Sequence, residues 1–365
     1  MEKSGMTPVI LAATGNGGEE DLKRAVRSAA EAATDFSWLS RGETVFIKPA
    51  HNSGKPYPAT THPGAVSAMI ELLREKGVRR VIVGDMAGIE HVKLTPQGVS
   101  RSTRRLMEAS GMGKAVEAAG GELHFFEEAG WQAFHEEFPT AGSNWQGGLM
   151  MPDILREVDH IILMPRCSRH VLLGATLGLK AAVGYWRTDT RLEYHRDAST
   201  IQEKTAEGNT VESLLKKQRL VISAADKVLA TFGPDHGIIL EPETGLVMAS
   251  SSVAAHDMVS LAWLLENRSR FVALGKDVFR DGNRLFARIA NHYVVNLLDG
   301  MGSSLASERL AKDPLNSIRD DRVLNRAYEV FGGRPKVVLE TVGGDLPGEL
   351  HRNLEKMMKP AQGNA

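Results

Sequence analysis

Apolar runs of strand length alternate with segments of helical periodicity in the first half of this chain. The runs at 43–49 (ETVFIKP) and 78–85 (VRRVIVGD) are rich in β-branched residues, and each ends in a proline or a Gly-Asp pair. Between them, residues 62–77 (HPGAVSAMIELLREKG) repeat apolar side chains at helical spacing, with Val66 and Ile70 one turn apart, and stop at a glycine. Strands separated by helices of this length predict βαβ crossovers and a parallel sheet.

Two further runs, 122–128 (ELHFFEE) and 158–165 (VDHIILMP), predict a third and a fourth strand. We therefore expect an α/β fold with a mostly parallel sheet, flanking helices and a smaller, more helical C-terminal region. The expected division is an α/β core over 1–264, a helical subdomain over 265–332, and a last strand, helix and frayed tail over 333–365.

Charge and cysteine content exclude several classes of protein. The 44 Lys and Arg residues balance 45 Asp and Glu residues, so no overall field attracts the chain to nucleic acid or to a membrane. Cys167 is the single cysteine, which excludes a disulfide framework and an iron–sulfur cluster held by this chain alone. The N-terminal apolar run is too short for a signal peptide, and no run approaches the length of a membrane span. We expect a cytoplasmic protein that binds neither nucleic acid nor membrane.

The loop after the fourth strand concentrates potential cations. Residues 165–184 (PRCSRHVLLGATLGLKAAVG) set Arg166, Arg169, His170 and Lys180 among glycines and small apolar residues. Ligands of open parallel sheets bind beyond the carboxyl ends of the strands, which is where this loop begins. The loop is either a solvated surface turn or the floor of a site for a small anion, and we favour the anion site. Lys180 has no acidic neighbour in the sequence. Its charge is therefore paired with an acidic residue far away in the sequence, exposed to solvent, or neutralised by a ligand.

Two other segments are expected to complete this site. HNSGKP (51–56) follows the first strand and offers turn amides and a lysine to an anion. Read as an extended chain, YWRTDTRLEYHRD (185–197) places its charged side chains on one face. It is then either a surface strand with its own ion pairs or a wall of the cleft, and we favour the wall. The residues expected to bind the substrate are Arg166, Arg169, His51, Lys55, Arg187 and Arg191.

Three blocks of the sequence, 47–85, 158–184 and 245–265, resemble the domain of unknown function 362 family, in the order in which that family has them. The resemblance implies the fold and the place of the site, whereas the family name leaves the activity open. Two departures matter. The family usually has lysines where this chain has Arg166 and Arg169, which keeps the charge and changes its geometry. Many members also carry clustered cysteines for iron–sulfur centres, which this chain lacks.

A second, more distant resemblance concerns the order of a histidine, a lysine and a histidine. His170 and Lys180 are ten residues apart and His195 follows fifteen later, which is similar to lactate racemase-type enzymes. There a lysine tethers a nickel–pincer cofactor and a histidine ligates the metal. His62, in TTHP, resembles the element that supplies a proton-transfer histidine in those enzymes. The resemblance implies either such a cofactor or a simple divalent metal ion, with His170, His195 and Asp257 as candidate ligands.

Together these residues predict an enzyme that acts on a small anionic molecule by proton or hydride transfer. It would be a racemase or epimerase, or an oxidoreductase. The expected catalytic residues are His170, Lys180, His62 and His195. The alternative is a non-enzymatic protein that binds a cofactor, a metal or an anion, because cations suffice for binding whereas catalysis needs an aligned proton acceptor. A homo-oligomer is left open.

Overall fold

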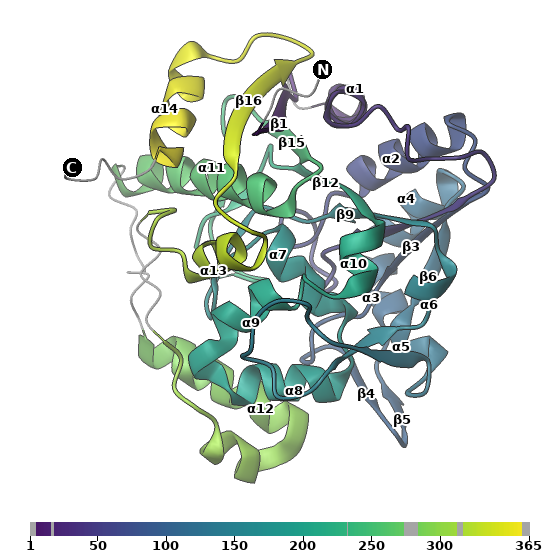
Figure 1. Cartoon of the computed structure of the whole chain (residues 1–365), viewed down its shortest axis with the longest axis vertical. Helices are drawn as coiled ribbons and strands as arrows, with labels where there is room; N and C mark the ends of the chain where they lie inside the picture. Colours follow the sequence, from purple (N-terminus) through teal and green to yellow (C-terminus); the bar gives the residue numbers. More distant parts are fainter. Residues whose placement is uncertain (1–4, 16–17, 232, 274–283, 312–316, 360–365) are drawn as a thin grey trace.

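The computed structural model describes residues 5–15, 18–231, 233–273, 284–311 and 317–359 of the chain. Its centre is an eight-stranded sheet (Figure 1). In spatial order, its strands are β16 (Lys336–Val342), β1 (Met6–Ala13), β15 (Leu246–Ser250), β12 (Gln218–Ala224), β9 (His160–Met164), β2 (Thr44–Pro49), β3 (Arg80–Asp85) and β6 (Glu122–Phe125). Within this sheet, β15 is antiparallel to both neighbours and every other adjacent pair is parallel. The prediction of a mostly parallel α/β sheet is confirmed.

Helices pack on both faces of the sheet because the strands are apolar on both sides. One face carries α1 (Glu19–Ala33), α2 (Pro63–Glu75) and α4 (Met112–Ala118), and the other carries α11 (Val253–Ala273) and α14 (Gly348–Met358). The remaining helices are α3 (Thr103–Ala109), α5 (Phe126–Ala129), α6 (Ile154–Glu157), α7 (Gly178–Ala181), α8 (Thr188–Arg196), α9 (Ile201–Glu207), α10 (Glu212–Lys217), α12 (Arg284–Ala306) and α13 (Arg322–Val330). Of these, α8, α9 and α12 gather at one end of the molecule in Figure 1.

Short strands decorate the ends of the central sheet. They form the pairs β4 (Lys93–Thr95) with β5 (Gly98–Ser100) and β7 (Phe134–Glu137) with β8 (Leu149–Pro152), and a small sheet of β10 (Ser168–His170), β11 (Gly174–Thr176), β13 (Val228–Leu229) and β14 (Ile239–Leu240). The small sheet folds the loop after β9 back on itself. No helix in the described ranges is long and apolar enough to cross a membrane.

The order of the strands reverses between β2 and β9. From β2 the chain steps outward to β3 and β6, and it then returns to the other side of β2 to form β9 and β12. In open parallel sheets, the crevice at such a reversal, beyond the carboxyl ends of the strands, is where ligands bind. The residues that follow β2 and β9 therefore face the expected ligand site.

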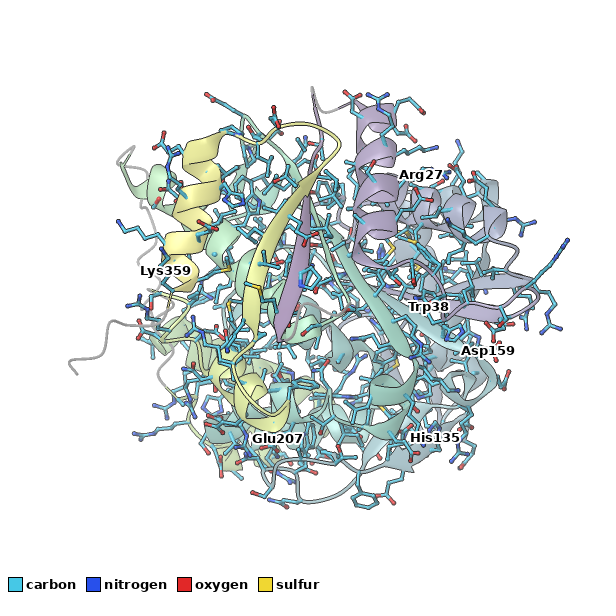
Figure 2. The ribbon with its side chains drawn as sticks, turned by 45° about the horizontal axis from the view of Figure 1, so that its top comes forward. Arg27, Trp38, His135, Asp159, Glu207 and Lys359 are labelled. Carbon is cyan, nitrogen blue, oxygen red and sulfur yellow. The ribbon has the colours of Figure 1, made fainter. Side chains whose placement is uncertain are left out.

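The opposite, amino-terminal ends of β2 and β9 are closed by side chains. Asp159 Oδ2 accepts a hydrogen bond of 2.8 Å from the Thr44 backbone N–H, and His160 Nε2 lies 2.9 Å from Glu43 Oε2. The Trp38 ring meets the His160 ring edge-on with centroids 4.7 Å apart; Trp38 and Asp159 are labelled in Figure 2. These contacts fill that edge of the sheet, and the carboxyl edge is left for a ligand.

The sequence-based interpretation of 185–197 as an extended chain was wrong. Thr188–Arg196 is the helix α8, and a 3₁₀ turn, Ala182–Tyr185, precedes it. The charges that alternate with a period of two also recur every four residues, which is the helical spacing. Tyr194 is fully buried against Trp145 and Trp186, and that aromatic packing favours the helix.

One strand of the central sheet was not predicted from the sequence. Strand β1 is an additional strand that inserts between β16 and β15. The division into 1–264, 265–332 and 333–365 stays a prediction, although residue 264 itself lies within α11.

Candidate functional site

A cavity of about 190 Å³ lies at the carboxyl ends of β2, β3 and β9. Its size is below the roughly 300–1,000 Å³ of pockets for drug-sized ligands, so it suits a small molecule. Ala290 and Val294 of α12 form part of its apolar wall. The basic and imidazole side chains that line it are Lys48, His51, His91, Arg166, His170, Lys180, Arg191 and His195.

Lys48 and Asp85 form a buried ion pair in this cavity. Lys48 is the penultimate residue of β2, and its Nζ lies 2.7 Å from Asp85 Oδ1 at the end of β3. Asp85 also accepts backbone hydrogen bonds of 2.8 Å from His51 and Met86. Burial lowers the pKa of Lys48, and the charge of Asp85 opposes that effect. A Cβ at Gly184 would collide with Lys48 Nζ and Asp85 Oδ1, so this position requires glycine.

Arg166 and Arg191 bring two further positive charges into the cavity wall. Arg166 Nη1 donates a hydrogen bond of 2.8 Å to the Pro234 carbonyl oxygen, and Arg191 donates to the carbonyl oxygens of Met86 and Ala87. The Nε–H group of each arginine is buried and has no acceptor among the described residues. Burial lowers the pKa of each guanidinium to about 10. The charge of Asp85 opposes this effect at both arginines, and Asp235 does so at Arg166.

Lys180 is the cation of the cavity with the fewest contacts. No hydrogen bond or ion pair to its Nζ occurs within the described ranges, and the Nζ lies 5.9 Å from the centroid of the Tyr194 ring. Burial, followed by the charges of Arg191, Arg166 and Lys48, lowers the pKa of Lys180 to about 7. Lys180 is therefore poised to bind or release a proton near neutral pH.

Asp257 fixes the backbone that carries Lys180. Its Oδ1 and Oδ2 accept hydrogen bonds of 2.8 and 2.7 Å from the backbone N–H groups of Gly178 and Leu179, at the start of α7. His256 Nδ1 lies 2.9 Å from Asp257 Oδ1. Both Asp257 oxygens accept hydrogen bonds within the core and Asp257 does not line the cavity, so its role as a metal ligand stays a prediction.

His170 presents a donor to the cavity. Its Nδ1 accepts a hydrogen bond of 3.1 Å from the Leu172 backbone N–H. Burial and the charges of Lys180 and Arg166 lower the pKa of His170 well below its usual value, so the ring is neutral and carries its proton on Nε2. In this tautomer Nε2 donates a hydrogen bond; the roles of His170 as proton acceptor or metal ligand need the other tautomer and stay predictions.

His195 has the opposite tautomer. Asn291 Nδ2 donates a hydrogen bond of 2.9 Å to the His195 carbonyl oxygen, which orients the amide so that its Oδ1 accepts from His195 Nδ1 at 3.0 Å. Burial lowers the pKa of His195 to about 3, and the Asn291 hydrogen bond opposes that effect. His195 Nε2 therefore carries a lone pair, and the two histidines supply one donor and one acceptor.

His51 is a third neutral histidine in the cavity wall. Burial lowers its pKa to about 4, and its Nε2 lies 3.2 Å from Ser110 Oγ. His51 Nδ1 is buried without a hydrogen-bond partner, and so is Thr176 Oγ1 in the same wall. Buried polar atoms without partners are uncommon in native proteins and often mark a place where a ligand or water binds.

Four residues expected in the site lie elsewhere. Arg169 donates to the carbonyl oxygens of His170 and Gly174 and closes the β10–β11 hairpin. Arg187 pairs with Asp189 and stacks on Trp131. Lys55 is exposed outside the cavity, and His62 caps α2, accepting a hydrogen bond of 3.0 Å from the Gly64 backbone N–H. Spacing in the sequence does not distinguish these four residues from those that line the cavity.

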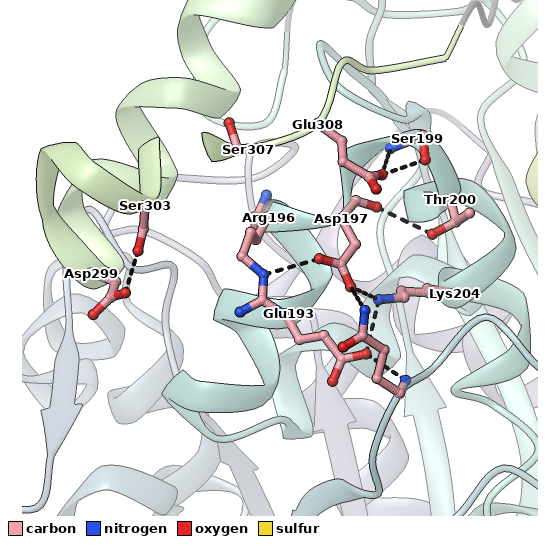
Figure 3. A network of polar contacts seen from close by, with 12 residues as sticks. Glu193, Arg196, Asp197, Ser199, Thr200, Lys204, Asp299, Ser303, Ser307 and Glu308 are labelled. Atoms are coloured by element: carbon pink, nitrogen blue, oxygen red, sulfur yellow. Dashed lines mark hydrogen bonds and ion pairs between the residues drawn. The ribbon is translucent and has the colours of Figure 1, made fainter. Parts of the chain in front are cut away.

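A charge network anchors the C-terminal end of α8, the helix that carries Arg191 and His195 (Figure 3). Lys204 of α9 is fully buried, and its Nζ lies 2.9 Å from Glu193 Oε1 and 2.8 Å from Asp197 Oδ2. Buried pairs with both charges satisfied in this way fix geometry.

Sequence reasoning missed four residues of the cavity. Lys48 had a usable signal, because it is a charge inside a strand that is otherwise apolar on both faces. Glu90, His91 and Asp235 lie in loops with no motif, and only the folded chain brings them to the cavity mouth.

The fold and the cavity define an α/β protein with a cavity lined by cationic side chains at the carboxyl ends of its parallel strands. The chain belongs to the family described as Domain of unknown function (DUF362), whose model matches residues 45–262. No curated protein matches the chain. Among solved structures, it is similar to the lactate racemase apoprotein from Thermoanaerobacterium thermosaccharolyticum, with 14% identity and a TM-score of 0.40. That match covers 66% of this chain and 54% of the other, so the chain spans about half of that structure.

A nickel–pincer cofactor stays a prediction. Lys180, whose Nζ has no protein partner in the described ranges, and His195, which offers Nε2, are the residues that would hold it. Both residues line the cavity of about 190 Å³.

Proposed function

We propose that this protein is an enzyme that binds a small carboxylate and moves a proton at the carbon next to the carboxylate group. The single observation that carries the proposal is Lys180, a cation without a protein partner in the described ranges, whose pKa is lowered to about 7. A base must be deprotonated at the working pH and still basic enough to take a proton, and a pKa near neutral meets both requirements.

Each neighbour of Lys180 has a defined task in this mechanism. The charges of Arg166 and Arg191 attract the carboxylate. Lys180 Nζ takes the proton, and the negative charge that develops on the substrate oxygen is stabilised by the His170 Nε2–H group. The Lys180 ammonium group then returns a proton to carbon, which completes the reaction. His195 Nε2 accepts a hydrogen bond from a hydroxyl group of the substrate. These roles favour small 2-hydroxy carboxylates and an epimerase or isomerase reaction.

Hydride transfer is less well supported, because the chain carries no glycine-rich dinucleotide-binding fingerprint. Non-enzymatic binding of an anion is the second candidate. The pKa of about 3 for His195 favours it, since a base this weak does not remove protons from carbon. The choice between an enzyme and a binding protein therefore depends on whether Lys180 acts as the base.

The decisive experiment is proton exchange in D₂O with D-lactate, L-malate and glycerate, followed by ¹H NMR. We expect loss of the signal of the hydrogen on the carbon next to the carboxylate, slowed 10²–10⁴-fold by Lys180→Ala. His236→Ala is the control, because His236 is exposed and does not line the cavity. Calorimetric binding without exchange would establish a binding protein instead, and neither binding nor exchange with any of the three would refute the proposal.

A further inference from the structure

Three side chains with metal-ligating atoms meet at the mouth of the cavity. Glu90 and His91 lie in the loop after β3, and Asp235 lies in the loop between β13 and β14. One ligating atom from each lies within 4.8 Å of the other two. We propose that Glu90, His91 and Asp235 bind one divalent first-row transition metal ion, separately from the proton transfer proposed above.

The distances fit a metal site that closes slightly on binding. Metal–nitrogen and metal–oxygen bonds of about 2.0–2.2 Å place two ligand atoms at most about 4.4 Å apart across one ion. The three ligand atoms lie within 4.8 Å of one another and Glu90 is exposed, so a small change at the Glu90 side chain would complete the site. His91 Nε2 and Asp235 Oδ2 are already 3.3 Å apart. Three protein ligands leave further coordination positions open towards the cavity.

The donor set indicates which ion would bind. One imidazole with two carboxylates suits Mn²⁺, Fe²⁺ or Zn²⁺, whereas Ca²⁺ and Mg²⁺ prefer oxygen ligands alone. Asn52 Nδ2 donates a hydrogen bond to Asp235 Oδ1, which orients the carboxylate and leaves Oδ2 facing His91. Such outer contacts typically support ligating carboxylates.

A second, independent observation also indicates a ligand at this place. His51 is 1% exposed, lines the same cavity one residue before Asn52, and has a buried Nδ1 without a partner. Arg166 is 2% exposed, also has an unpartnered Nε, and is bonded to the carbonyl oxygen of Pro234, the neighbour of Asp235. The charge of Asp235 acts on Arg166, so the carboxylate that would bind the metal ion also offsets the repulsion between the ion and the arginine.

The test is titration of the full chain, expressed without a polyhistidine tag and stripped of metal, with Mn²⁺ followed by electron paramagnetic resonance. We expect one Mn²⁺ per chain. His91→Ala and Asp235→Asn should each weaken binding at least tenfold, and His236→Ala, which changes an exposed histidine of the same loop, should leave it unchanged. Zn²⁺ titration by calorimetry provides a second probe.

Two results would overturn this metal site. One is the absence of Mn²⁺ and Zn²⁺ binding at millimolar concentration. The other is binding that both variants leave intact or that His236→Ala weakens equally. Glu90→Gln keeps the test valid if His91→Ala or Asp235→Asn impairs folding, because Glu90 is exposed whereas the other two are half-buried. Proton exchange catalysed by the metal-free protein would show that the proposed function holds even when the metal site is refuted.

Discussion

Gly178 lies directly against Asp257. A Cβ built on Gly178 would lie 2.7 Å from Asp257 Oδ1 and 3.0 Å from Val253 Cγ2, while the Gly178 N–H donates to the same oxygen at 2.8 Å. His256 Nε2 in turn lies 2.9 Å from Ser223 Oγ on β12. The backbone that carries the cavity lysine is thus held to the sheet through a chain of buried hydrogen bonds.

Gly178→Ala should destabilise the protein by about 1–3 kcal/mol, because the added methyl group overpacks the contact with Asp257. Urea denaturation measures the loss. Gly113→Ala is the matched control: the nearest atoms to a Cβ there are 3.7 Å away, and alanine in helix α4 should stabilise by about 0.5–1 kcal/mol. Equal effects of the two substitutions would contradict the close contact at Gly178.

Lys180→Met should leave the melting temperature unchanged or raise it, because it removes a charge with no protein partner in the described ranges. Lys48→Met should cost about 3–5 kcal/mol, because it leaves Asp85 buried without its partner. Thermal melting of the two variants makes the comparison within one cavity. A sharp loss of stability in Lys180→Met would show that this lysine is structural.

The pKa of Lys180 has a consequence for stability against pH. Its folded-state pKa of about 7 lies below the ordinary value of 10.5. Between these values the unfolded chain holds a proton that the folded chain has released, so the contribution of Lys180 to stability rises with pH. We expect the stability advantage of Lys180→Met over the wild type to be largest below pH 7 and to shrink towards pH 10. Urea denaturation at a series of pH values measures it, and an advantage that grows with pH would contradict the lowered pKa.

The tautomers of the two cavity histidines can be read directly by ¹⁵N NMR. At pH 7 we expect His170 to carry its proton on Nε2 and His195 on Nδ1, since Leu172 donates to the first and Asn291 accepts from the second. Asn291→Leu should abolish the preference at His195 and leave His170 unchanged. The same tautomer on both rings would show that the hydrogen bonds do not control them.

The strands of the core follow from local sequence, because buried parallel strands are continuous apolar runs. The expected strands at 43–49 and 78–85 correspond to β2 and β3. The run at 122–128 ends as a strand at Phe125, where the chain turns into the short helix α5. Residues 185–197 could not be assigned in this way, since their charges satisfy the strand and the helix periods equally.

The cavity is less predictable than the sheet, because it depends on which loops meet. Arg166 and Lys180 reach it from one loop, whereas Arg169, between them in the sequence, turns its guanidinium to backbone carbonyl groups of the hairpin. A three-residue difference in position separates a ligand-facing cation from a structural one. Asp235 reaches the cavity from a loop about seventy residues beyond Arg166 in the sequence. No local sequence pattern reveals that the two loops meet.

The family match ends at residue 262, yet α12 supplies Ala290 and Val294 to the cavity wall and Asn291 to His195. The cationic floor of the cavity and part of its apolar wall are thus encoded in separate stretches of the gene. Insertion, loss or exchange of the C-terminal stretch can retune selectivity and the proton position on one imidazole while the cationic floor is inherited intact. Relatives that share the floor are then free to diverge in what they accept.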